Sequence, residues 1–139
     1  MTPRFRAICW LIVVSCVVNA CEDSGIEPGN VSFSQQVQPI LTDRCAFGGC
    51  HASTSPAAGQ SLAEGLAYVN TVNVPSQELP SMDRVEPGDP DRSYLVHKIR
   101  GTHLDVGGSG LRMPQGQEPL SEDQINLIRA WIGQGARNN

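Results

Sequence analysis

The stretch CAFGGCH, residues 45–51, is the most chemically specific part of this 139-residue chain. Four residues separate its two cysteines, and a histidine follows the second cysteine directly. Apolar residues precede the stretch at the spacing of one helical face. These residues are Phe33, Val37, Ile40 and Leu41. The pattern predicts a helix over about residues 33–44 that ends at the first cysteine, with Ser32 or Ser34 as its cap and with Pro39 near its start or at a kink.

Two thiols beside an imidazole are typical of covalent haem attachment, whose usual form is Cys-x-x-Cys-His. Each thiol, here Cys45 and Cys50, adds across a haem vinyl group, and the adjacent His51 ligates the iron as the proximal ligand. Covalent attachment holds a haem in a chain that is too small to bury it by packing alone. It also supplies apolar bulk to a chain that has only seven aromatic residues.

Other chemistries of the same residues stay open. A Cys45–Cys50 disulfide is reasonable in an oxidising compartment. A zinc site could use both cysteines with two of the chain's three histidines, His51, His97 and His103. A thiol-redox motif would need two intervening residues and a βαβ context, neither of which the sequence has.

The N-terminus predicts export. Arg4 and Arg6 precede an apolar run from residue 7 to residue 18, which is too short to span a bilayer but suits a secretory signal. The run ends in Val-Asn-Ala-Cys at residues 18–21, which resembles the lipobox of bacterial lipoproteins. We therefore expect residues 1–20 to be a signal peptide and Cys21 to be acylated. An ordinary signal peptide that leaves a free Cys21 is the alternative.

Residues 21–31 are then a lipidated cysteine with a flexible tether, and residues 32–139 form one domain. The expected location is a membrane surface that faces the periplasm, in either the inner or the outer membrane. Fourteen glycines and ten prolines predict long irregular segments. A net charge of −4 without a basic cluster argues against nucleic acid as a partner.

Further helices are indicated by their end signals. Asp89 and Pro90 begin one helix that Gly101 ends. Ser121 and Gln124 form a capping box for the last helix, and its apolar stripe follows at helical spacing. The residues of this stripe are Ile125, Ile128, Trp131 and Ile132. A weaker capping box, Ser61 to Glu64, suggests a short helix from about residue 62 to residue 70. Residues 72–80 look extended, and residues 103–117 look like a glycine-rich loop.

The order of motifs resembles a small single-haem cytochrome c domain over nearly all of the mature chain. The resemblance rests on five segments. They are VQPIL (37–41) before CAFGGCH, PGDP (87–90), SYL (93–95), RMP (112–114) and RAWIGQGA (129–136). It implies an all-α fold of three to four short helices with long loops around one covalently bound haem c. The four-residue spacing departs from the usual motif, and Gly48 and Gly49 offer the flexibility to accommodate it.

The resemblance also implies a distal iron ligand, Met113, in the Arg-Met-Pro segment. Met82, His97 and His103 are the alternative ligands. Arg112 is a weaker candidate, for pairing with the haem propionates, and so are Trp131 and Phe47, for walling the haem.

The expected function is electron transfer by a lipid-anchored c-type cytochrome, not catalysis, either alone or as the haem subunit of an oxidoreductase complex. Its partners would be redox proteins at the membrane, which its acidic surface would meet through basic patches. Two alternatives stay open. One is a five-coordinate haem sensor or weak peroxidase, and the other is a haem-free, disulfide-bonded binding lipoprotein.

Overall fold

The computed structural model describes residues 29–52 and 55–139. Within these ranges the regular structure is helical, and the only β pairing is a pair of isolated bridges, Val72 with Val85 and Pro75 with Asp83. The prediction of an all-α chain with a large irregular share is therefore confirmed for this part of the molecule. The predicted signal peptide, Cys21 and most of the predicted tether lie outside the described residues.

The helix that leads into the motif has two parts. A π-helical segment, η1 (Phe33–Val37), runs directly into α1 (Gln38–Arg44). Ser32 is the N-cap and accepts a hydrogen bond from the backbone N–H of Gln35 at 3.3 Å. Pro39 lies in the first turn of α1, directly after the junction with η1. The predicted helix and its cap are confirmed. The first part of this helix is π-helical, and the second part is α-helical.

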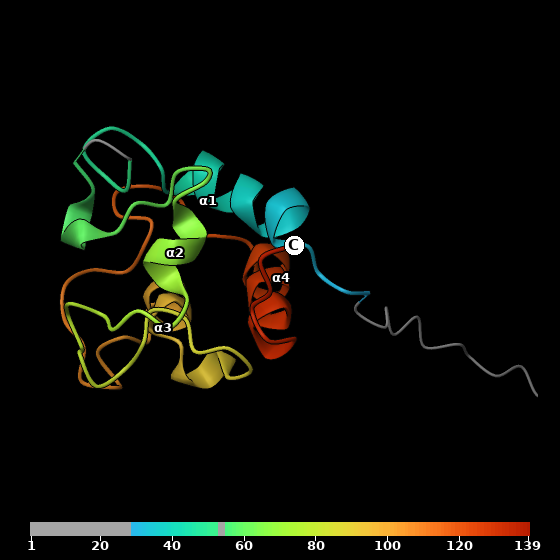
Figure 1. The fold of residues 1–139 in the computed structure, drawn as a ribbon. Helices are drawn as coiled ribbons and strands as arrows, with labels where there is room; N and C mark the ends of the chain where they lie inside the picture. Colours follow the sequence, from blue (N-terminus) through green and yellow to red (C-terminus); the bar gives the residue numbers. More distant parts are fainter. Residues whose placement is uncertain (1–28, 53–54) are drawn as a thin grey trace, which may run out of the picture.

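The last helix, α4 (Glu122–Gly133), begins as predicted. Ser121 and Gln124 form both hydrogen bonds of the capping box, and Leu120, just before the cap, is buried together with Ile125. The buried stripe of α4 packs on η1, where the rings of Trp131 and Phe33 lie 5.0 Å apart. In Figure 1, α4 lies along one edge of the molecule and α1 runs across the top, above α2.

Both ends of the domain meet beside this helix pair. The backbone N–H of Ser34 donates to the carbonyl of Asn139 at 2.9 Å. Val31, expected in the tether, is buried, and its N–H donates to the Gln134 side chain at 2.8 Å. Packing of the domain therefore begins at Val31, one residue earlier than the sequence indicates.

The helix expected from Pro90 to Gly101 is interrupted. It consists of a 3₁₀ turn, η3 (Pro90–Arg92), and α3 (Tyr94–Arg100), with an extended Ser93 between them. The backbone N–H groups of Tyr94 and Leu95 donate to the carbonyls of residues 83 and 84 rather than to η3. Asp89 caps η3 and Gly101 ends α3 in a left-handed conformation, so both predicted ends are confirmed.

The short helix expected over residues 62–70 begins later, as α2 (Ala67–Thr71). The N–H of Leu62 donates to the carbonyl of His51, and Gly65 has a φ of +78°. The chain around the proposed capping box is therefore bound to the motif and turns before α2 begins. The expected short helix is present, but its predicted start and capping box were wrong.

Residues 103–117 contain no helix, as predicted. Figure 1 shows this segment and the chain around α2 and α3 on the side of the molecule away from α4. Among the described residues, no helix is long and apolar enough to cross a membrane.

Candidate functional site

A cavity of about 320 Å³ lies on this loop-rich side. Its walls include Cys45, Cys50 and His51 from the motif and Met113 from the glycine-rich loop. The volume falls at the lower end of the roughly 300–1,000 Å³ of small-molecule and cofactor sites. The fold thus brings Met113 to the same cavity as the three motif side chains, although Met113 is more than 60 residues away in sequence, and all four can bind a cofactor.

The motif folds into consecutive turns that start from the end of α1. The carbonyl of Cys45 accepts hydrogen bonds from the N–H groups of Phe47 and His51, at 3.0 and 3.1 Å. The N–H of Cys50 donates to the carbonyl of Phe47 at 3.0 Å. Gly49 has a φ of +83°, which a residue with a side chain rarely adopts. The spacing between the cysteines is two residues longer than in the usual Cys-x-x-Cys-His motif. A tight turn accommodates this length and places Cys50 and His51 at the cavity.

The ring of His51 is oriented by a backbone acceptor. Its Nδ1 lies 2.9 Å from the carbonyl oxygen of Gln60, and because a carbonyl only accepts, Nδ1 carries the proton. In the neutral ring Nε2 is then the acceptor nitrogen, and it makes no hydrogen bond to the described residues. An imidazole held at Nδ1 with a free Nε2 is the usual arrangement of a metal-binding histidine.

Both cysteines of the motif are free thiols. Cys45 is 8% exposed, and this burial raises its pKa to about 11; the nearby Arg44 opposes the shift and Cys50 adds slightly to it. Cys50 is half-buried. The cavity wall therefore carries two reduced sulfurs beside an imidazole, which is the donor set that covalent haem attachment requires.

Met113 is held to α3 by its backbone. Its N–H donates to the carbonyl of Lys98 at 2.9 Å, and the following peptide bond, to Pro114, is cis. Arg112, one residue earlier, donates from Nε to the carbonyl of Ile99 at 3.0 Å. The side chain of Arg112 is thus hydrogen-bonded to the last turn of α3 and does not line the cavity.

Three other residues that the sequence suggested as haem contacts or iron ligands also lie outside the cavity lining. Trp131 packs on Phe33, and its Nε1 donates to the carbonyl of Arg137 at 2.9 Å. Phe47 lies at the surface of the motif loop. Met82 lies in the bend that pairs with the chain near Ser76.

The two remaining histidines are engaged elsewhere. His97 borders a second, open groove, and its ring contacts Thr102 and the carbonyl of Asp91, each at 2.9 Å. His103 is buried, and its Nε2 lies 3.1 Å from the carbonyl of Gly110. In the described parts of the chain, no group of three His, Cys, Asp or Glu side chains could hold a metal ion. A haem iron needs only one or two protein ligands.

Sequence reasoning missed a polar cluster on the cavity wall, formed by Glu78, Tyr94 and Lys98. The Nζ of Lys98 and the hydroxyl of Tyr94 both donate to Oε2 of Glu78, each at 2.7 Å. Tyr94 and Lys98 share one face of α3 by their spacing of four, but no local pattern connects them to a glutamate in a distant loop.

Arg84 also lines the cavity and is buried. Its guanidinium donates to the carbonyls of Asn70 and Ala58 at 2.7 and 2.9 Å. Arg84 thereby links the segment around Ala58 to α2, which contains Asn70.

The chain was compared with protein-family models, curated proteins and solved structures, and none of them matches it.

Proposed function

We propose that the chain is a c-type cytochrome, anchored to a membrane through an acylated Cys21, that carries single electrons through one covalently bound haem. The observation that supports this proposal is the convergence of Cys45, Cys50, His51 and Met113 on one cavity. The residues fit the group: two reduced thiols and an imidazole with a free Nε2 come from one loop, and a thioether comes from another.

The two thiols hold the cofactor. Cys45 and Cys50 would bind the haem covalently through thioether bonds, each formed by addition of an S–H to a vinyl group with no net gain or loss of electrons. Burial raises the pKa of the Cys45 thiol and so lowers the fraction of reactive thiolate at neutral pH, whereas Cys50 is more accessible. Attachment of haem before folding is complete, while Cys45 is still exposed, would avoid this loss of thiolate.

His51 and Met113 would supply the protein ligands of the haem iron at its two axial positions. His51 is kept in the correct tautomer by Gln60, and Met113 is tied to α3 through its own N–H. Bound in this way, haem supplies a one-electron couple between ferrous and ferric iron, and a methionine ligand raises its reduction potential. With both positions filled by protein, the site transfers electrons and does not bind a substrate.

The electrons would come from and go to other one-electron redox proteins at the same membrane. The chain has fourteen acidic and ten basic side chains, and its docking would be sensitive to salt. The tether would let the domain reach more than one partner.

The test is the intact mass and visible spectrum of the protein purified from membranes of a strain that carries haem-maturation genes. We expect the mass of one haem and of an acylated Cys21, and we expect Cys45→Ser with Cys50→Ser to abolish the haem. A protein without haem that is two hydrogens lighter than its dithiol form would be a disulfide-bonded lipoprotein, and the cytochrome proposal would fall.

Carbon monoxide distinguishes a carrier from a five-coordinate sensor or peroxidase, because it binds ferrous haem rapidly where an axial position is open. We expect slow, incomplete binding to the wild type and rapid binding to Met113→Leu. Met82→Leu, outside the cavity, is the matched control and should behave like the wild type. Rapid, complete binding to the wild type would favour the sensor or peroxidase.

A further inference from the structure

The ion pair between Glu78 and Lys98 stands on the wall of the same cavity. Lys98 Nζ lies 2.7 Å from Glu78 Oε2, and the two side chains are 9% and 30% exposed. The pair is therefore partly shielded from water, and its charges act over a longer range than those of a surface pair.

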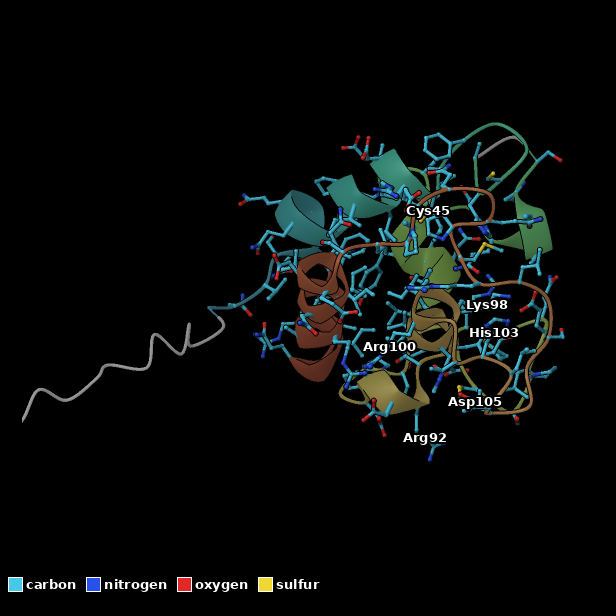
Figure 2. The ribbon with its side chains drawn as sticks, turned by 180° about the vertical axis from the view of Figure 1, so that it is seen from behind. Cys45, Arg92, Lys98, Arg100, His103 and Asp105 are labelled. Carbon is cyan, nitrogen blue, oxygen red and sulfur yellow. The ribbon has the colours of Figure 1, made fainter. Side chains whose placement is uncertain are left out.

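The pair is held rigidly by its neighbours. Lys98 also donates to the carbonyl of Ser109 at 3.1 Å, and its ammonium lies 5.9 Å from the centre of the Tyr94 ring. The hydroxyl of Tyr94 donates to Glu78 and accepts from the N–H of Ser109. Figure 2 shows Lys98 and His103 together on the side of α3 that faces the loops.

Glu78 is held in its charged form. Burial acts to raise the pKa of Glu78, but hydrogen bonds from Lys98 and Tyr94 and the charge of Lys98 outweigh it, so this pKa is lowered. The ion pair thus places opposite charges on the wall of the cavity that the four proposed haem-binding residues also line.

We propose that Glu78 and Lys98 form an opposed charge pair that sets the reduction potential of the cofactor in this cavity. The inference rests on the proposed cytochrome function. Gaining an electron makes the cofactor more negative, so the carboxylate favours the oxidised form and the ammonium favours the reduced form. Removing one charge leaves the other uncompensated.

Glu78→Gln and Lys98→Met test this proposal through their effects on the reduction potential. A unit charge about 10 Å from a redox centre, at an effective dielectric constant of about 20, shifts a one-electron equilibrium roughly tenfold. We expect Glu78→Gln to favour the reduced form and Lys98→Met to favour the oxidised form, each by about that factor. The double variant should return toward the wild-type potential.

Asp91→Asn is the matched control. Asp91 pairs with Arg129 at 2.8 Å, but its side chain is 80% exposed and lies outside the cavity. The substitution changes the net charge as Glu78→Gln does, and it should leave the potential almost unchanged.

The opposite signs of the two expected shifts in reduction potential distinguish an electrostatic role of the pair from a purely structural one. If the pair only held the Met113 loop in place, both single variants would lose methionine ligation and both potentials would fall. Shifts in the same direction, or shifts no larger than that of Asp91→Asn, would overturn the inference while the haem-loaded wild type still supported the proposed function. A wild-type protein without haem would overturn both.

Discussion

The two sides of the molecule are built differently. On the side of η1, α1 and α4, apolar stripes interlock and bury Trp131, Phe33 and their neighbours almost completely. On the cavity side, α2 and α3 join the same apolar core, but hydrogen bonds from polar side chains, such as those of Arg84 and Lys98, hold the loops. His51 and Met113 therefore lie on loop segments that are positioned by hydrogen bonds, whereas the helix pair is positioned by apolar packing.

The strongest test of this comparison is Trp131→Ala. Trp131 is 1% exposed and packs on Phe33, so its loss leaves a cavity in the helix pair. We expect the free energy of unfolding to fall by about 3–5 kcal/mol in denaturant titrations. The control is Leu104→Ala in the glycine-rich loop, where the side chain is 64% exposed; there we expect a change within about 0.5 kcal/mol. Similar losses for both variants would contradict the comparison.

The second test concerns the reactivity of Cys45 in the haem-free protein. Burial raises the pKa of this thiol from 9.0 to about 11, so its thiolate fraction at neutral pH falls roughly 100-fold. We expect alkylation of Cys45, followed by mass mapping, to be slower by about that factor than in the urea-unfolded chain.

The same pKa shift predicts a dependence of stability on pH. The folded state favours the protonated Cys45 thiol, so its contribution is present below about pH 9 and is lost as pH rises through about 11. Cys45→Ala should remove this component of the alkaline loss in the haem-free protein. An unchanged alkaline profile in this variant would contradict the assignment.

The third test removes a polar link on the cavity side. Arg84→Met leaves the carbonyls of Ala58 and Asn70 without their donor, and we expect a loss of about 1–3 kcal/mol in unfolding free energy. Hydrogen exchange should rise first near these two residues and not in α4. Arg84→Lys, which keeps the charge but not the two-pronged geometry, should recover only part of the loss.

The smallest expected effect is that of Ser121→Ala at the start of α4. The Ser121 hydroxyl accepts from the N–H of Gln124 at 3.2 Å, and loss of such a cap costs about 1 kcal/mol. Ser81→Ala, an exposed serine in a bend, serves as the reference and should change stability little. Equal melting temperatures for the two variants would show that the cap contributes little here.

Helix ends were predictable from sequence where their signals are local. Ser32, Ser121 and Gly101 act within one turn of their own helices, so their roles follow from residue type and spacing. The break at Ser93 was not predictable, because the N–H groups that follow it bond to residues 83 and 84 through tertiary contact. The late start of α2 has the same cause, since Leu62 is bound to His51.

The candidate site likewise has features that were predictable from sequence and features that were not. The donor types and the spacing of CAFGGCH can be read directly from the sequence, and a family resemblance singles out Met113. Three features could not be read from it: these residues share a cavity, Gln60 orients His51, and Glu78 pairs with Lys98. The physical reason is that a local pattern acts through neighbouring backbone groups, whereas a cavity wall forms only when distant segments pack together.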